Sequence, residues 1–137
     1  MKSAAPDAEV ILFGATDAEL GPLPFVARNL GPIDVSARAA ILNEAHVLLD
    51  VSSSDGALPL EAAACGCAVV EPTQGSRAAT PDELTEAVLR LLRDDDLRAR
   101  VVERGLAAAA EATWERSGAQ LERILRETCF VQLSSTT

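Results

Sequence analysis

The sequence is poor in aromatic residues, with three Phe, one Trp and no Tyr among 137 residues. Its hydrophobic fraction is still 48%, so alanine and leucine supply most of the apolar side chains, a composition that favours helices. No apolar run approaches the roughly 18 residues of a membrane helix, and residues 1–9 lack the apolar core of a signal peptide. We therefore expect a cytoplasmic chain without direct membrane insertion, long enough to form one domain with its own core.

Basic residues are also few, because 12 Lys and Arg stand against 21 Asp and Glu, giving a formal net charge of −9. A surface of this sign repels nucleic acid and anionic membranes, so we expect neither as a direct partner. It also repels a nucleotide diphosphate at long range. A phosphate site in this chain would therefore have to act locally, through backbone amides and a helix dipole.

Histidine and cysteine are too few to suggest a metal centre or a cofactor site. Cys65 and Cys67 have no histidine close in the sequence, and we interpret them as buried structural thiols. An odd total of three cysteines suits a reducing compartment. We interpret the single histidine, His46, as structural. The acidic run at residues 94–96 is typical of a loop and a helix N-cap rather than of a metal cluster.

The most informative stretch is residues 45–71, which has the pattern strand, loop, helix, strand. Residues 46–52 are mostly apolar and of strand length, and residues 67–70 form a second short apolar run. Between them, residues 58–65 have helical composition and Gly66 is placed to end the helix. Two strands that flank a helix predict a right-handed βαβ unit with parallel strands.

The carboxyl end of the first of these strands is the expected ligand site. In open α/β sheets, ligands bind outside the carboxyl ends of the strands. There, residues 53–57 form a loop of small polar side chains and glycine that leads into the helix, whose first amides are unpaired. Glu61 follows one turn later, and its carboxylate is suited to accept hydrogen bonds from ribose or sugar hydroxyls.

The flanking sequence predicts further elements of an α/β domain. We expect strands at residues 10–14 and 25–28, then a helix over residues 35–45 with Asp34 as its N-cap. Thr80, Pro81 and Glu83 predict a second helix start. Its apolar face should pack on the sheet, and it comprises Leu84, Ala87, Val88, Leu91 and Leu92.

The C-terminal third predicts helices, with a break at Gly105 between residues 97–103 and 106–112. In the last helix, over residues 114–127, Trp114, Leu121 and Leu125 form an apolar stripe that we interpret as part of the core. Residues 131–137 read as a polar, frayed tail. The expected fold is a Rossmann-like, three-layer α/β domain with a small parallel sheet of about four strands and a helical C-terminal region. Its expected divisions are a flexible segment at 1–9, the domain at 10–128 and a tail at 129–137.

Residues 52–70 fit the pattern S-x-x-D-G-x-x-x-L-E-A-x-A-C-G-x-x-V-V, which resembles the donor-binding motif of GT-B glycosyltransferases. The likeness is to the retaining, nucleotide-sugar-dependent group that includes bacterial rhamnosyl- and mannosyltransferases. Weaker similarity continues in the same order through residues 94–100 and 114–116. The resemblance implies the C-terminal, donor-binding domain of such an enzyme. Its ligand would be a nucleoside diphosphate sugar, and the acceptor would be held by an N-terminal domain missing from this chain.

The resemblance also implies roles for individual residues. Glu61 matches the family glutamate that usually contacts the nucleotide ribose, whereas the first glutamate of the family pair falls on Ser53, with Asp55 nearby. The family's diphosphate-binding amides map to Gly56, Ala57 and Leu58. The positions beside the base map to Gly14, Ala15, Pro32 and Ile33. No residue of this chain is assigned a catalytic or metal-binding role.

The sequence departs from the family in ways that keep two alternatives open. A complete GT-B enzyme has two Rossmann-like domains, and the basic pair that usually begins the donor half is absent before Val10. One alternative is therefore a noncatalytic scaffold or interaction domain derived from this fold. The other is a receiver-like signalling domain, because residues 47–51 are similar to a phosphoacceptor strand. Receiver chemistry would need an acidic pair where Gly14 and Ala15 stand, and a lysine near Glu71.

Overall fold

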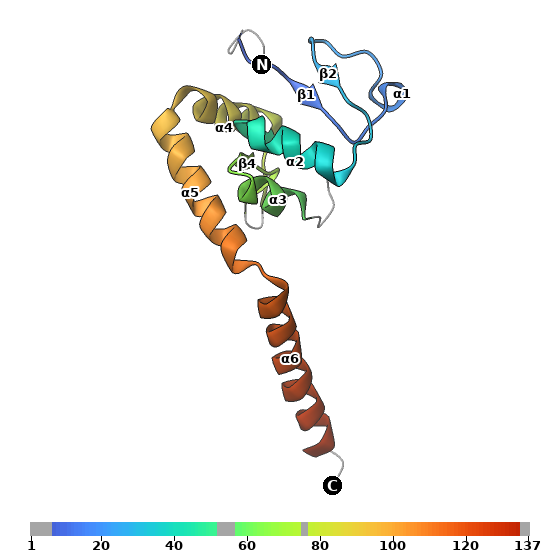
Figure 1. Ribbon diagram of the computed structural model, residues 1–137, viewed down its shortest axis with the longest axis vertical. Coiled ribbons are helices and arrows are strands. Elements are labelled where there is room, and N and C mark those ends of the chain that lie inside the picture. The colour runs from blue at the N-terminus through green and yellow to red at the C-terminus, as the bar shows by residue number, and fades with distance from the viewer. Residues whose placement is uncertain (1–6, 52–56, 75–76, 135–137) are drawn as a thin grey trace.

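The computed structural model describes residues 7–51, 57–74 and 77–134 and consists of short strands and longer helices (Figure 1). In chain order the elements are β1 (Ile11–Leu12), α1 (Asp17–Leu20), β2 (Arg28–Asn29), α2 (Val35–Glu44), β3 (Val47–Leu49), α3 (Leu58–Ala64), β4 (Ala68–Val70), β5 (Thr73–Gln74), β6 (Arg77–Ala78), α4 (Pro81–Arg93), α5 (Asp95–Glu111) and α6 (Trp114–Ser134). The chain is thus of mixed α/β class, and helices predominate.

The predicted βαβ unit is confirmed in β3, α3 and β4. The two strands pair in parallel, with Val47 opposite Ala68 and Leu49 opposite Val70. The ladder continues past β3, because the Asp50 N–H donates to the Val70 carbonyl over 3.0 Å. Gly66 ends the intervening helix with a φ of 78°, a left-handed conformation that glycine adopts without steric cost.

A single parallel sheet of about four strands was expected, but the structure has separate pairs of strands instead. Among the described residues the strands form separate pairs: β1 with β2 in parallel, β3 with β4 in parallel, and β5 with β6 antiparallel. The β1–β2 pair is only two residues long, so it offers few ladder groups for a neighbouring strand. Its crossover, residues 13–27, is long enough for a parallel connection, but the helix in it, α1, is a single turn. The strands of the described residues therefore confirm the α/β class but not a continuous Rossmann-like sheet.

Local signals predicted the start of α4 correctly and that of α5 to within two residues. Thr80 and Glu83 form a reciprocal capping box, in which the Thr80 N–H donates to Glu83 Oε2 over 2.7 Å and the Glu83 N–H donates to Thr80 Oγ1 over 3.3 Å. The Asp94 side chain accepts from the Leu97 N–H over 2.8 Å at the start of α5. The acidic run thus provides a helix cap, as predicted, but α5 begins at Asp95 rather than at residue 97, so Asp95 and Asp96 lie in its first turn. No metal-binding cluster occurs among the residues that the structure describes.

The predicted helix break at Gly105 is wrong, because α5 runs without interruption from Asp95 to Glu111. Gly105 serves tertiary packing instead: a Cβ built on it would lie 3.2 Å from the Cβ of Ala63 in α3. A larger residue would hold the two helices apart, so the missing side chain permits their close contact.

The core consists of two clusters on either side of the β3–β4 pair. One contains Leu42, Leu48, Ala62 and Cys67, with Phe13 and Leu58 packed against it. The other joins Ala68 and Val70 to the α4 residues Val88 and Leu91, so the predicted core face of α4 is confirmed.

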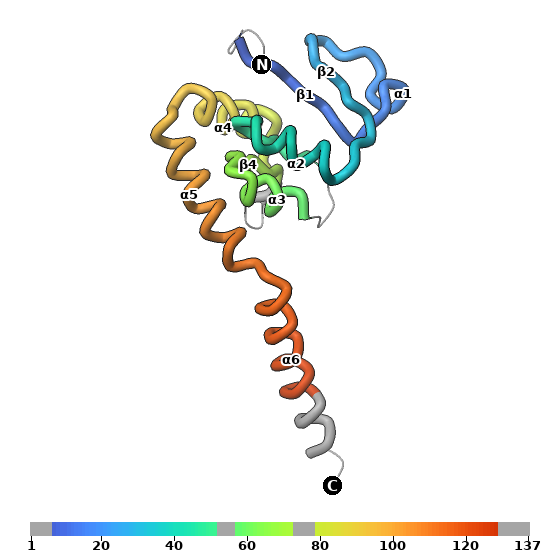
Figure 2. The backbone as a smooth tube through the Cα atoms, viewed as in Figure 1, coloured from blue at the N-terminus to red at the C-terminus, as the bar shows by residue number. Residues whose placement is uncertain are grey.

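The interpretation of the C-terminal apolar stripe as core is wrong. In α6, Trp114 is 90% exposed and Leu121 and Leu125 are more than half exposed. Figure 2 shows why: α6 extends away from the strands and the other helices, so these side chains have no layer to pack against. The helix also continues to Ser134, through most of the segment expected to be a tail. None of the described helices combines the length and hydropathy needed to cross a bilayer.

Candidate functional site

The candidate site lies at the carboxyl end of β3, where the chain turns toward α3. Asp50 follows the strand and is buried, with 7% of its surface exposed, whereas Val51 is 70% exposed. Three predicted donor-binding residues, Ser53, Asp55 and Gly56, lie outside the described residues. The described part of the site therefore begins at Ala57.

The start of α3 is fixed by packing and by Pro59 rather than by a capping side chain. Ala57 is the N-cap residue and Pro59 lies in the first turn, where its missing N–H costs no helical hydrogen bond. The Leu58 side chain packs against the core cluster of Leu42, Leu48, Ala62 and Cys67. The Glu61 N–H donates to the Ala57 carbonyl over 2.8 Å, which places Glu61 one turn after the loop.

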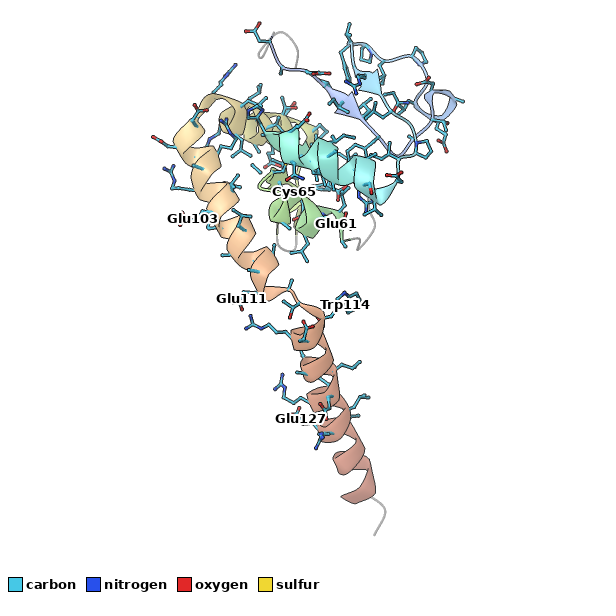
Figure 3. All side chains as sticks on the ribbon, in the orientation of Figure 1. Glu61, Cys65, Glu103, Glu111, Trp114 and Glu127 are labelled. Carbon is cyan, nitrogen blue, oxygen red and sulfur yellow. The ribbon has the colours of Figure 1, made fainter. Side chains whose placement is uncertain are left out.

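The Glu61 carboxylate forms an ion pair with Arg38 of α2. Arg38 Nη2 lies 2.8 Å from Glu61 Oε2, and the two side chains are 27% and 39% exposed. Glu61, labelled on α3 in Figure 3, is therefore partly accessible, and its carboxylate is paired with Arg38. The Nε atom of Arg38 is buried and has no hydrogen-bond partner in the described part of the chain.

Arg38 is the residue of this site that sequence reasoning missed. It lies in an alanine-rich helix with no clear amphipathic pattern, so nothing local assigns its direction. One signal was present in the sequence: Arg38 is the only Lys or Arg in residues 29–76. The one cation in a stretch that contains the βαβ unit was a candidate partner for a carboxylate in that unit.

The predicted base-side residues lie where β1 and β2 end. The Gly14 N–H donates to the Gly31 carbonyl over 2.8 Å, and both glycines have positive φ, 97° and 64°. Phe13, which precedes Gly14, packs against the same cluster as Leu58. In Figure 1, β1 and β2 end on the side of the molecule where α2 and α3 begin.

The Gly14–Gly31 hydrogen bond and the packing of Phe13 on the core place the loops that contain Gly14 and Ile33 on the same side of the molecule as the start of α3. Ala15 is held to β2, because the Asn29 side-chain amide donates to its carbonyl over 3.1 Å. Ile33 is partly buried and Pro32 is exposed. The structure records no direct contact between these residues and Glu61 in the parts of the chain that it describes.

The hollows on the surface of the described chain lie elsewhere. Two shallow pockets of about 360 and 370 Å³ flank the end of β4, and both are lined by Val69, Glu71 and Val101. One extends along α4 and the other along α3 to Gly105. Glu61 lines neither of them. Their walls are mainly apolar, with Glu71 in both and Arg90 in one as the charged side chains.

The surroundings of Cys67 and of the buried Asp50 do not suit them to act as a reactive thiol or as a phosphoacceptor. Burial raises the pKa of the Cys67 thiol to about 11, so at neutral pH it is protonated and unreactive. Cys65 is half-buried on the adjoining turn. Asp50 would be the phosphoacceptor of a receiver domain, and its burial does not suit a group that must react with a phosphodonor.

Comparison with models of known protein families finds no match to this chain, and comparison with curated proteins finds none either.

Proposed function

We propose that this chain binds a nucleoside diphosphate sugar, as the donor-binding domain of a glycosyltransferase. The observation that carries the proposal is the position of Glu61. Its carboxylate lies one turn into the helix that follows β3, is 39% exposed and is anchored by Arg38. A carboxylate at the carboxyl end of a parallel strand is suited to accept hydrogen bonds from a ribose. The resemblance of residues 52–70 to the GT-B donor motif supports the same assignment.

In this proposal the chain supplies binding and orientation but no reacting group. Glu61 accepts from ribose hydroxyls, and the diphosphate is assigned to the backbone amides at positions 56–58, as the resemblance implies. The loops that contain Gly14 and Ile33 border the base. The acceptor is held by a separate N-terminal domain, so the isolated chain transfers no sugar. Turnover of a nucleotide sugar by the pure chain would contradict this division of roles.

A noncatalytic scaffold derived from the same fold is the second candidate. It is favoured by the Arg38–Glu61 ion pair itself, because that pair also joins α2 to α3 and so gives Glu61 a structural role. The low number of basic residues around the site favours it as well. The two candidates differ in one measurable property, which is nucleotide binding.

A two-dimensional amide NMR titration with UDP, GDP, ADP and dTDP separates these candidates. Donor binding predicts saturable shifts at residues 57–61, which the Glu61→Ala variant loses. Glu86→Ala is the matched control, because Glu86 is an exposed carboxylate on α4. This variant should bind like the wild type. No shifts at millimolar nucleotide would refute donor binding and favour the scaffold.

A further inference from the structure

We propose that Arg38 is a positioning residue for ribose recognition. In this inference, which rests on the proposed function, the guanidinium holds Glu61 Oε2 and thereby leaves Oε1 oriented to accept from a ribose hydroxyl. The ligand class is then a ribonucleoside diphosphate sugar rather than a 2′-deoxyribonucleoside one. Arg38 acts through Glu61 and does not itself contact the sugar.

The first support is the rigidity of the helix that holds Arg38. Its N-cap, Asp34, accepts from the Ala37 N–H over 2.8 Å, and the Arg38 N–H donates to the Asp34 carbonyl over 3.0 Å. Arg38 thus lies in the first, capped turn of α2, and α2 packs against α3. The ion pair thus joins a capped turn of one helix to the adjoining helix, which limits the side-chain geometries that keep the two groups together.

The second support is the incomplete hydrogen bonding of the guanidinium. Arg38 Nε is buried without a partner among the described residues. A buried, unpaired donor is unfavourable, so Arg38 does not complete a saturated structural network. What it does complete is the ion pair with Glu61, whose carboxylate oxygens have more acceptor capacity than one arginine uses.

The third support is charge. The chain has a net charge of −9, and residues 29–76 contain no Lys or Arg other than Arg38. An uncompensated Glu61 would repel the diphosphate of its own ligand. Pairing with Arg38 offsets that carboxylate charge while keeping its acceptor function. Loss of Arg38 therefore has two effects, a general weakening through charge and a specific loss of ribose selectivity.

These two effects can be separated by comparing ribo- and deoxyribonucleotides. UDP and dUDP carry the same charge and differ only in the 2′-hydroxyl, so their affinity ratio reports on ribose recognition alone. Calorimetric titration of the full chain with UDP/dUDP, GDP/dGDP and ADP/dADP gives this ratio for each base. A hydrogen bond to a charged acceptor predicts a preference of about tenfold or more for the ribonucleotide in the wild type.

Arg38→Ala should reduce that ratio to nearly one, as should Glu61→Gln combined with Arg38→Ala. Arg38→Lys, which keeps the charge but not the planar fork, should recover only part of the selectivity. Arg28→Ala is the control, because Arg28 is exposed and pairs with Glu9 over 3.7 Å on β2. It should leave the ratio unchanged. Circular dichroism melts identify variants that do not fold, in which case Arg38→Lys and Arg38→Met provide the test.

The outcomes distinguish this inference from the function on which it rests. A folded Arg38 variant that keeps the wild-type ratio would overturn the role of Arg38 and leave donor binding intact. If the wild type bound the ribonucleotide and the deoxyribonucleotide with equal affinity, ribose recognition by Glu61 would be overturned, and the inference with it. Diphosphate binding would remain supported. Absence of binding by the wild type would overturn the proposed function and the inference together.

Discussion

Replacing Gly105 with alanine sets two effects of opposite sign against each other. Glycine inside a helix is less favourable than alanine by about 1 kcal/mol, so propensity alone predicts stabilisation of α5. The new Cβ would, however, lie 3.2 Å from the Cβ of Ala63, closer than ordinary van der Waals contact. Ala63 is 8% exposed and has no rotatable side chain, so the contact can be relieved only by moving the backbone of α3 or α5.

We expect the steric effect to prevail. Overpacking of a tight contact costs about 1–3 kcal/mol, against a gain of about 1 kcal/mol from propensity. The net expectation is a loss of about 1 kcal/mol in the free energy of unfolding. For a chain of 137 residues that corresponds to a fall of about 4 °C in the melting temperature. Thermal unfolding followed by circular dichroism at 222 nm measures it.

Gly118 provides the matched control, because it also lies within a helix and a Cβ built on it meets no atom within 4 Å. Gly118→Ala should therefore not lower the melting temperature. Adding Ala63→Gly to Gly105→Ala removes the contact, so the two substitutions should be less destabilising together than the sum of each alone. A Gly105→Ala protein as stable as the wild type, or more stable, would refute the packing argument.

Three further predictions concern a cap, a thiol and the terminal helix. Thr80→Ala removes the acceptor from the α4 capping box and should lower the unfolding free energy by about 1 kcal/mol, measured by urea denaturation; an unchanged midpoint would contradict the capping role. Because burial raises the folded-state pKa of Cys67 from 9.0 to about 11, the unfolded thiol ionises first. The stability that Cys67 contributes should therefore be complete below pH 9 and be lost as the pH rises to about 11, a dependence absent from Cys67→Ala. A chain ended after Thr113 should keep residues 7–113 folded, with a change of less than about 0.5 kcal/mol in unfolding free energy, because Trp114, Leu121, Ile124 and Leu125 of α6 are exposed; loss of the cooperative melt would show that α6 supports the core.

The features that could be predicted from the sequence are those set by neighbouring residues. The capping pair Thr80 and Glu83 depends only on residues three positions apart, and it lies as expected. The acidic run also caps a helix, although α5 begins at Asp95, two residues before the predicted start. The β3–β4 pairing follows from two apolar runs joined by a helix of suitable length. The start of α3 was also predicted, from the helical composition after the loop, although tertiary packing of Leu58 contributes to fixing it.

The features that were mispredicted depend on contacts between distant parts of the chain. Gly105 is a helix breaker by propensity, and only the approach of Ala63 makes it a packing residue. The partner of Glu61 is likewise decided by the contact of α2 with α3, which no local pattern of Arg38 reveals. The stripe of Trp114, Leu121 and Leu125 has the period of a buried helix face, but periodicity does not determine which surface, if any, covers it.

The exposure of Trp114 determines what intrinsic fluorescence and near-ultraviolet absorbance can report about this protein. The chain has one tryptophan and no tyrosine, so its intrinsic emission and most of its near-ultraviolet absorbance come from a single indole at the start of α6 (Figure 3). That indole is already 90% solvated in the folded chain. Its emission should therefore change little when the two core clusters around β3 and β4 unfold. An unfolding curve recorded by tryptophan fluorescence would then not report the unfolding of the core. Quenching by acrylamide, in contrast, would respond directly to anything that covers the first turn of α6, which makes Trp114 a built-in sensor for that helix alone.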